Sequence, residues 1–241
     1  MRSGLLSFFC CGRVLRRKLL VALLLCCFSA MPQAGQLDPY ESFNRKVFSF
    51  NESTDRWLLK PVAKAYRWLM PGPIDRAVSN VFDNFSELRN ALNSGLQGDF
   101  SQTAIASGRF CINSMAGLLG VFDVATGFGL QRRDEDFGQT LAVWGVDSGA
   151  YLMLPFLGGS SLRDAFALPA DNALSLPSQI DDVSARNGAF AVDIIDTRAD
   201  LLDAEALLSG DRYLFLRDIY FQQRQRQIDN GLLEDDFDSD F

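Results

Sequence analysis

Apolar residues recur every three or four positions along most of the chain after residue 37, which is the spacing of one face of an α-helix. In the first such segment, "LDPYESFNRKVFSFNEST", the apolar face is made by Tyr40, Phe43, Val47 and Phe50. Asp38 is placed to cap this helix, with Pro39 at its first position and Glu41 three residues after the cap. The pattern predicts a capped amphipathic helix.

Prolines divide the following segment into two helices. "RWLLKPVAKAYRWLMPGP" predicts a helix that restarts at Pro61 and stops before the rigid turn Pro71-Gly72-Pro73, because proline has no amide hydrogen to donate to a helix. The next helix carries one broad apolar stripe and ends at Gly98. The stripe consists of Ile74, Val78, Phe82, Phe85, Leu88, Leu92 and Leu96. Ser101 is placed to cap the helix that follows.

The second half of the chain continues the helical pattern with one exception. A charged loop between Arg132 and Asp136 precedes a short helix in "FGQTLAVWGV", and further helices cover residues 178–229, with Asp203 and Asp211 as candidate caps. The exception is "GAYLMLPFLGGSSLRDAF", an extended apolar run interrupted by proline and glycine. With no internal repeat and no βαβ alternation, we predict an all-α fold in one domain.

The N-terminus has the order of a secretory signal. Basic residues over 13–18 are followed by an apolar run over 19–28 and then by small residues. The apolar run is too short to span a bilayer. We therefore expect residues 1–30 to be a signal sequence for export, with the cleavage site fixed only approximately.

Cysteine use leaves two alternatives for the mature N-terminus. Four of the five cysteines lie in the signal region, so Cys111 is the one that stays beyond the cleavage zone. If cleavage falls before Cys26 or Cys27, that cysteine could carry a lipid as in bacterial lipoproteins, although those signals place a small residue before it and here Leu25 or Cys26 stands there. If cleavage falls after Cys27, neither a lipid anchor nor an internal disulfide can form.

Removal of residues 1–30 would make the exported chain strongly acidic. The whole chain has a net charge of −7, and the loss of five of its 23 basic residues leaves 18 against 30 acidic ones, or about −12. Nucleic acids and anionic lipid surfaces both require a basic face on their partner. We therefore expect no nucleic-acid partner, and any membrane contact has to be hydrophobic.

Few groups in this composition suit catalysis. Histidine is absent, which excludes histidine-assisted nucleophiles and most catalytic zinc sites, and the chain lacks Gly-x-Ser-x-Gly and phosphate-loop motifs. Carboxylate pairs remain as acid and base candidates: Asp134, Glu135, Asp136, Asp181, Asp182, Asp193 and Asp196. The simpler interpretation is a solvated loop over 134–136, a polar turn at 181–182 and two water-facing side chains. We expect a protein that is not an enzyme and holds no metal or cofactor, with a carboxylate hydrolase as the weakest alternative.

Apolar residues exceed what the core of such a domain needs. The chain has 20 phenylalanines, clustered in segments such as "FNRKVFSFN" and "VFDNF", beside many Leu, Ile and Val. Most of the phenylalanines are expected in the core. The surplus apolar surface on an exported protein needs an apolar partner.

The stretch "GRFCINSMAGLLGVFDVATGFGLQ", residues 108–131, is apolar and contains several glycines. A transmembrane span needs about 20 uninterrupted apolar residues, and Asn113, Asp123 and the glycines at 117, 120, 127 and 129 argue against one here. Two interpretations stay open. The stretch is a buried hairpin of the core, or it is a bent helical hairpin that lines a cavity, where glycines let the backbone bend and the two polar residues lie beside apolar ones. The second would suit an amphiphile with a polar head and apolar tails.

Several blocks of sequence resemble one known family. They are "LDPYESFNRKVFSFN", "LLKPVAKAYRWLMPGPIDRAVSNVFDNFSE", "LNSGLQGDF", "GLLGVFDVA", "EDFGQTLAVWGVDSGAYLMLPFLGGSSLRD" and "IDTRADLLDAEALL", in the family's order over residues 37–231. By these blocks the chain resembles the VacJ-like, or MlaA, family of outer-membrane lipoproteins that maintain lipid asymmetry. The resemblance implies a ring-like bundle of amphipathic helices in the periplasmic leaflet of the Gram-negative outer membrane, around a central amphipathic channel. Independently of the resemblance, the acidic composition of residues 232–241, "LLEDDFDSDF", predicts a disordered tail.

The resemblance also implies a function. Family members remove mislocalised phospholipids from the outer leaflet, associate with a trimeric outer-membrane porin, and pass the lipids to a soluble periplasmic phospholipid carrier without making or breaking a bond. The alternative is a soluble periplasmic lipid-binding chaperone that uses the same cavity.

Two groups of residues are the candidate sites. The first belongs to the glycine-rich stretch, as channel lining and hinge: Asn113, Gly117, Gly120, Phe122 and Asp123. The resemblance matches the last four of these to the family's hairpin beside the channel. The second belongs to a helix of the ring, for which packing and capping are the simpler roles: Phe43, Asn44, Phe50 and Asn51.

Overall fold

The structure is a computed structural model that describes residues 38–203 and 210–229. Its α-helices are α2 (Glu41–Thr54), α3 (Lys60–Leu69), α4 (Gly72–Gln97), α5 (Phe100–Met115), α6 (Val124–Gly127), α7 (Phe137–Val143), α8 (Leu162–Ala173), α9 (Val183–Asp200) and α10 (Arg212–Ile228). A π-helical turn η1 (Asp55–Leu59) joins α2 to α3, and a 3-10 turn η2 (Pro177–Gln179) precedes α9. Strands β1 (Tyr151–Leu154) and β2 (Gly158–Ser161) form an antiparallel hairpin. The prediction of a helical fold is confirmed, with this hairpin inside the segment that the sequence marked as extended.

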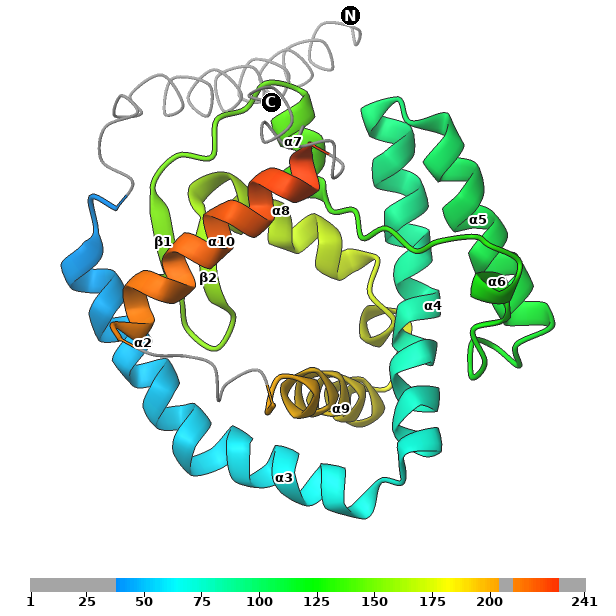
Figure 1. Cartoon of the computed structure of the whole chain (residues 1–241), viewed down its shortest axis with the longest axis horizontal. Coiled ribbons are helices and arrows are strands. Elements are labelled where there is room, and N and C mark those ends of the chain that lie inside the picture. The colour runs from blue at the N-terminus through cyan, green and yellow to red at the C-terminus, as the bar shows by residue number, and fades with distance from the viewer. Residues whose placement is uncertain (1–37, 204–209, 230–241) are drawn as a thin grey trace, which may run out of the picture.

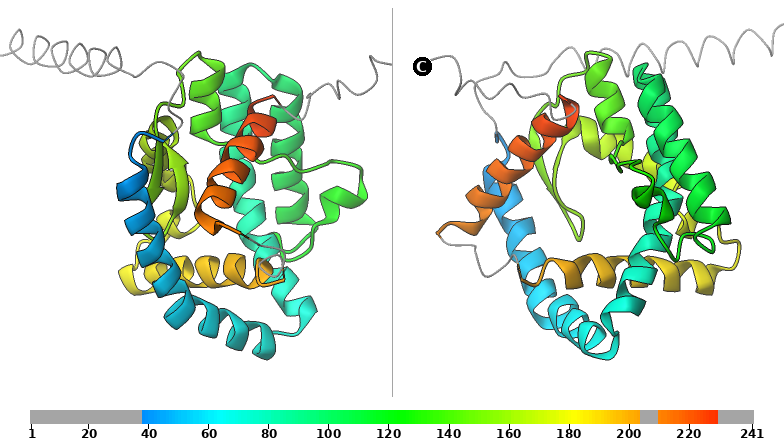
Figure 2. Two further views of the ribbon diagram at one scale, coloured as in Figure 1. Left: turned by 60° about the vertical axis from the view of Figure 1, so that its left-hand side comes forward. Right: turned by 45° about the vertical axis from the view of Figure 1, so that its right-hand side comes forward.

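The elements follow one another around a closed circuit in Figure 1. The arm made by α2, η1 and α3 turns into α4 at Pro71, α5 packs along α4, and the chain returns through α7 to the hairpin, whose strand β1 lies beside α2. Both views in Figure 2 keep α9 alongside α3. The channel that the resemblance implies inside this circuit stays a prediction.

A small apolar core lies between α2, the hairpin and α10. Tyr151 and Met153 of β1 and Tyr213 of α10 are buried together, and Phe48 of α2 packs against them. The rings of Tyr151 and Tyr213 meet edge to face with centroids 6.2 Å apart, a favoured geometry for aromatic pairs. This core fixes the hairpin between two helices that are distant in sequence.

Two of the predicted helix starts are wrong. Asp38 does not cap α2, which begins at Glu41 without a side-chain cap. The Asp38 carboxylate instead accepts hydrogen bonds from the Asn44 amide (2.8 Å) and the Tyr213 hydroxyl, so a tertiary partner takes the place of the local one. The cap of α5 is Asp99, which accepts from the Gln102 amide at 2.9 Å, because Gly98 in a left-handed conformation (φ 86°) ends α4 one residue before it.

The other boundaries follow the sequence more closely. The helix does not restart at Pro61, because the π-helical turn carries α2 into α3 without a break and the proline lies in the first turn of α3. Asp211 caps α10 as predicted, and Asp182 caps α9. Asp203 pairs with Arg67 at 3.0 Å, and the residues that it was expected to cap lie outside the described part of the chain.

Three predictions concern residues that the structure does not describe. The signal sequence over 1–30, with the alternatives at Cys26 and Cys27, lies outside the described ranges, as does the tail over 232–241.

Candidate functional site

Helix α4 faces its neighbours with polar side chains. Its buried residues are Asn84, Glu87, Asn90, Asn93 and Ser94, all of them polar. Four residues of the predicted apolar stripe, Ile74, Leu88, Leu92 and Leu96, are exposed. In a domain surrounded by water an amphipathic helix turns the opposite face outward, because apolar surface is stabilised by burial. The sequence located the stripe correctly, and the structure turns these four residues of it away from the protein interior, with the other three half-buried.

Large apolar side chains are exposed on neighbouring elements too, and we call the whole set the outer apolar surface. Besides the four residues of α4, its most exposed large side chains are Trp57, Trp68, Leu69, Phe100, Met115, Leu118, Leu119, Phe122 and Phe128. Trp57 and Trp68 are 81% and 83% exposed. No helix in the described ranges is long and apolar enough to cross a membrane. A surface of this kind is suited to an apolar partner that covers it from one side.

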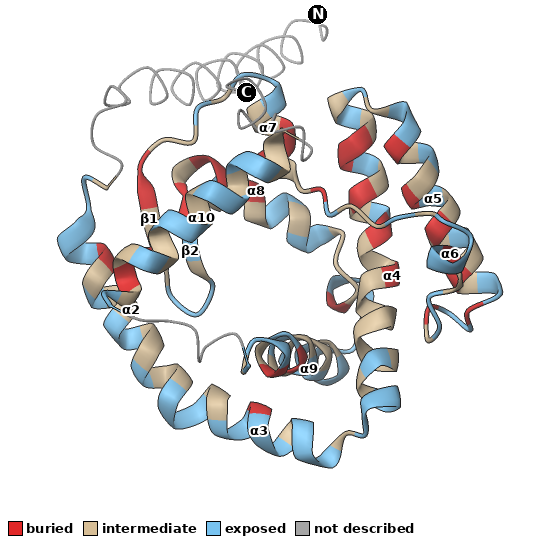
Figure 3. Ribbon diagram, in the orientation of Figure 1, coloured by how far each residue is buried: buried red, intermediate tan, exposed pale blue. Residues whose placement is uncertain are grey.

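Charged groups lie buried between α4 and α5. The Arg109 guanidinium of α5 pairs with the Glu87 carboxylate of α4 at 2.6 Å, and the two side chains are 3% and 1% exposed. The Asn90 amide also donates to Glu87. Figure 3 marks buried positions on both helices. Two buried charges are tolerated because each has a partner of opposite sign and further hydrogen bonds.

The glycine-rich stretch forms the end of α5, a tight loop and α6; we call residues 116–123 the α5–α6 loop. The Asp123 carboxylate caps α6 through the Thr126 amide and also accepts from Arg109 and Asn113. Partial burial acts to raise the pKa of Asp123, but hydrogen bonds from Thr126, Asn113 and Arg109 outweigh it and lower the pKa to about 2. Asn113 itself is buried and accepts from the Ala125 amide at 2.8 Å. Asn113 and Asp123 therefore bind each other and the backbone in this conformation.

Two positions in the α5–α6 loop require glycine because neighbouring atoms lie too close for a side chain. A Cβ atom on Gly117 would lie 2.1 Å from the Phe122 carbonyl oxygen. Gly120 has φ 97°, and a Cβ on it would lie 2.5 Å from the Asn84 Cβ of α4. Both glycines hold the loop against its neighbours, and the hinge motion predicted for them stays a prediction.

The α5–α6 loop presents apolar side chains on its outer side. Leu118 and Leu119 have left-handed φ values of 54° and 59°, which leucine rarely adopts, and Phe122 is 57% exposed. Between Gly120 and Phe122, Val121 lines an apolar groove of about 280 Å³ together with residues of α4. Sequence analysis did not single out Val121, because a valine among other apolar residues belongs to no motif.

The asparagines of α2 hold the hairpin. Asn44 donates to the Tyr151 carbonyl (3.0 Å) and accepts from the Met153 amide (2.9 Å). Asn51, seven residues later on the same face of α2, donates to the Leu154 carbonyl and accepts from the Phe156 amide, both at 2.9 Å. The two amides thus satisfy the backbone groups of β1 at the edge that β2 leaves open. The pair Phe-Asn repeats at a spacing of seven in α2, a signal for this arrangement that the sequence analysis did not use.

The phenylalanines beside these asparagines lie at the surface. Phe43 is 58% exposed and Phe50 49%. Phe50 meets Phe156 of the hairpin tip edge to face at 5.3 Å. Of the predicted ring-helix residues, the asparagines join α2 to the hairpin and the phenylalanines face outward.

Several of the candidate carboxylates bind other parts of the protein. The solvated loop expected over 134–136 is wrong for Glu135, which is 1% exposed; burial raises its pKa, and hydrogen bonds from Gln97 and Arg133 counteract this in part. Asp196, expected to face water, is buried and accepts from Tyr66 of α3 and Ser79 of α4, both at 2.8 Å.

Three of the remaining carboxylates of this group cap helices or form ion pairs. Asp136 caps α7 and pairs with Arg224, Asp134 pairs with Arg132, and Asp182 caps α9. Burial raises the pKa of Asp193, with further contributions from the charges of Asp196 and Asp83. In the described residues no group of three or more His, Cys, Asp or Glu side chains is arranged to hold a metal ion.

Comparison with known proteins gives consistent matches over most of the chain. The family model for the MlaA lipoprotein matches residues 36–227. A protein of Shigella flexneri named intermembrane phospholipid transport system lipoprotein MlaA is 37% identical over 221 residues, which cover 87% of this chain and 85% of the relative. A protein of the same name from Haemophilus influenzae is 31% identical over 202 residues, covering 81% of each. A structure solved in work on the structural basis for maintenance of bacterial outer membrane lipid asymmetry is similar with a TM-score of 0.72 and 36% identity, covering 80% of this chain and all of that one.

Proposed function

The chain belongs to the MlaA lipoprotein family, and we propose that it takes mislocalised phospholipids out of the outer leaflet of the Gram-negative outer membrane and so maintains lipid asymmetry. The names of the relatives, which refer to intermembrane phospholipid transport, support this proposal. The work behind the similar structure concerns outer-membrane lipid asymmetry.

The observation that carries the proposal is the inverted burial of α4. Five polar residues of this helix are buried while Ile74, Leu88, Leu92 and Leu96 are exposed. Exposed apolar side chains are stabilised when hydrocarbon surrounds them, and polar groups in hydrocarbon need partners within the protein. If lipid covers the outer apolar surface, the exposed apolar side chains lie in hydrocarbon and the buried polar side chains keep their partners within the protein.

The proposed location is the periplasmic leaflet of the outer membrane. One leaflet offers about half of the ~30 Å hydrocarbon thickness of a bilayer, which suits short amphipathic helices better than spans. Trp57 and Trp68 near the two ends of α3 are of the type that anchors proteins at a membrane interface. An export signal at the N-terminus would bring the chain there, and a lipid on Cys26 or Cys27 would add a second attachment.

The proposed activity is transport without bond chemistry. Phospholipids would pass through an amphipathic channel to a periplasmic phospholipid carrier, with a trimeric porin as the partner in the membrane. Two of the carboxylates that a hydrolase could use are already engaged, Asp136 in a helix cap and an ion pair and Asp196 in a hydrogen bond from Tyr66, which supports a role without catalysis. Because the chain has no nucleotide-binding motif, the energy for transport would come from its partners or from a lipid gradient.

The function is tested by the amount of phospholipid at the cell surface. In a strain that lacks the gene, phosphatidylethanolamine labelled by an amine-reactive reagent that does not cross the membrane should increase, and restoring the gene should reverse the increase. An unchanged signal, with the protein verified in the parent strain, would reject the proposal.

The membrane assignment is tested separately against the soluble chaperone alternative. We expect the wild-type protein to fractionate with membranes and to resist washing with high salt, because the contact is hydrophobic rather than electrostatic. The double variant Trp57→Lys/Trp68→Lys should be released to a measurable extent. Gln222→Lys/Gln223→Lys adds the same charge at exposed polar positions of α10 and should stay bound. A wild-type protein found wholly in the soluble fraction would favour the chaperone.

A further inference from the structure

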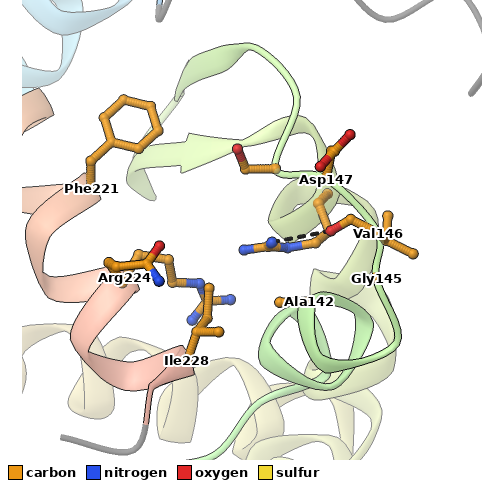
Figure 4. Close-up of a pocket in the computed structure, with 10 residues that line it drawn as sticks. Ala142, Gly145, Val146, Asp147, Phe221, Arg224 and Ile228 are labelled. Atoms are coloured by element: carbon orange, nitrogen blue, oxygen red, sulfur yellow. Dashed lines mark hydrogen bonds between the residues drawn. The ribbon is translucent and has the colours of Figure 1, made fainter. Parts of the chain in front are cut away.

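A pocket of about 320 Å³ lies between α7, the loop after it and the second half of α10, which we call the α7–α10 pocket. Figure 4 shows Gly145 and Val146 on one side of it and Arg224 and Ile228 on the other. Its volume lies at the lower end of the range of ~300–1,000 Å³ typical of small-molecule sites. It is separate from the α5–α6 loop and from the asparagines of α2.

One side chain of this pocket has a nitrogen without an acceptor. Arg163, in the first turn of α8, is 3% exposed. Its Nε donates to Asp164 (2.9 Å) and its Nη1 to the Val146 carbonyl (3.3 Å, dashed in Figure 4), whereas its Nη2 is buried without an acceptor among the described residues. A buried guanidinium nitrogen without an acceptor is costly and uncommon, so the site favours a ligand that brings an oxygen to it.

The other charges around the pocket are paired with one another. Arg224 holds Asp136 and also pairs with Asp164 at 2.7 Å, so Asp164 serves two guanidinium groups at once. The exposed Asp147 carboxylate points away from the Arg224 side chain (Figure 4). The two arginines and two carboxylates balance in charge, so the attraction for an oxyanion comes from Arg163 Nη2 alone, which has no acceptor among the described residues.

The walls of the pocket add apolar surface to this donor. Ala142, Val146, Phe221 and Ile228 lie around it. An oxyanion next to apolar groups is the chemistry of an amphiphile, and a phosphodiester carries one negative charge with two oxygens that match a guanidinium. We propose that the α7–α10 pocket binds the phosphodiester of a phospholipid headgroup, with Arg163 Nη2 as the donor. This inference rests on the proposed function, since it names the group by which the same lipid is recognised.

The test measures binding to the purified full chain in maltoside micelles by calorimetry. Dihexanoylphosphatidylglycerol, used below its critical micelle concentration, should bind, and Arg163→Gln should weaken this binding at least about ten-fold, as expected for loss of a charge-assisted hydrogen bond. Dihexanoylglycerol, which lacks the phosphate, should bind wild type and variant alike. Arg133→Gln is the matched control: Arg133 pairs with Asp99 and Glu135 outside the pocket, and its loss should leave phospholipid binding unchanged.

Three results would overturn the proposal. One is no phospholipid binding by the wild type, and another is equal binding by wild type and Arg163→Gln. The third is inorganic phosphate that binds as tightly as the phospholipid and is lost with it in Arg163→Gln, which would assign the pocket to free phosphate. If Arg163→Gln does not fold, Arg163→Lys decides, because lysine keeps the charge beside Asp164 but lacks the second donor nitrogen.

The two proposals fail in distinguishable ways. Phospholipid binding that depends on Arg163, together with unchanged surface phospholipid in the deletion strain, would reject the proposed function alone. Binding that does not depend on Arg163, together with a reversible increase in surface phospholipid, would reject this site alone.

Discussion

The α5–α6 loop and the tip of the β1–β2 hairpin both present apolar side chains from unfavourable backbone conformations, but they are supported differently. Leu118 and Leu119 in the loop and Phe156 in the hairpin tip have left-handed φ values of 54°, 59° and 65°. Each side chain is about two thirds exposed. Such conformations cost about 1–2 kcal/mol per residue. In both regions, therefore, the folded state is less stable than it would be without these conformations, which point the apolar side chains outward.

The supports of the two regions differ in charge and burial. The α5–α6 loop is braced by the Asp123 carboxylate, which contacts Arg109 of the buried pair with Glu87, and by the close approach of Gly120 to α4. The hairpin tip is held by the neutral amide of Asn51 and by one ring contact between Phe50 and Phe156. We infer that the loop is the rigid member of the pair and that the hairpin tip is the first of the two to move.

Breaking the charged support should have the largest effect. Arg109→Met leaves the Glu87 carboxylate buried without its partner, and we expect a loss of about 3–5 kcal/mol in the free energy of unfolding. Thermal unfolding in maltoside micelles, followed by circular dichroism, measures it. The double variant Glu87→Leu/Arg109→Met should recover part of the loss because no single charge stays buried. A loss below about 1 kcal/mol in Arg109→Met would show that the pair does not brace the loop.

Crowding the loop against α4 should have the next largest effect. Gly120→Val places a branched side chain at φ 97°, where a Cβ already lies within 2.5 Å of Asn84, and we expect a loss of about 2–3 kcal/mol. The matched control is Gly127→Ala in α6, where no atom lies within 4 Å, and its unfolding temperature should change little. The surface-phospholipid assay on both variants adds the functional result. Full activity of Gly120→Val would argue against a hinge or channel role at this position.

Loosening the hairpin should have a smaller and more local effect. Asn51→Ala removes the hydrogen bonds to the Leu154 carbonyl and the Phe156 amide, for an expected loss of about 1–2 kcal/mol. Hydrogen exchange should speed up at the Phe156 amide while the amides of the α5–α6 loop keep their rates. Ser53→Ala, which removes only a bond to the backbone of α2, is the control. Equal acceleration in both regions would mean that they are coupled, contrary to the comparison.

The smallest effect is a pH dependence confined to the loop. The folded pKa of Asp123, about 2, lies below its ordinary value of 3.8, so its stabilisation is present above about pH 4 and is lost as the pH falls toward 2. Because 32% of this side chain is exposed, we expect a contribution of only about 1 kcal/mol. The difference in unfolding temperature between wild type and Asp123→Asn should shrink from pH 6 to pH 2. A difference that stays constant over this range would show that the Asp123 carboxylate does not stabilise the loop through its charge.

Helix positions could be predicted from the sequence, and their caps only in part. The apolar stripe of α4, its end at Gly98 and the cap of α10 at Asp211 were correct because each depends on neighbours within one or two turns. Asp38 was misassigned because its partners are Asn44 and Tyr213, and the second is 175 residues away. A carboxylate that can cap a helix can equally accept a distant hydroxyl, and local spacing does not distinguish the two.

In the candidate site too, the sequence identified local features and missed contacts between distant residues. The sequence alone marked Asn113, Gly117, Gly120 and Asp123 as unusual within an apolar stretch, and it located the surplus of large apolar residues. It could not place Arg109 beside Glu87 or leave Arg163 Nη2 without an acceptor, because both facts depend on helices that meet only in the fold.

By itself, then, the sequence determined the helical fold and the amphipathic faces, because these depend on residue type and short-range spacing, and its blocks indicated the family by their resemblance to it. Only the tertiary structure decided that the polar faces point inward and the apolar faces outward. The hydrophobic periodicity of the sequence shows that a helix has an apolar and a polar face, but it does not show which face packs against the protein interior. That choice follows from buried partners such as Glu87 and Arg109, which stabilise polar groups inside and leave the apolar groups to the surroundings.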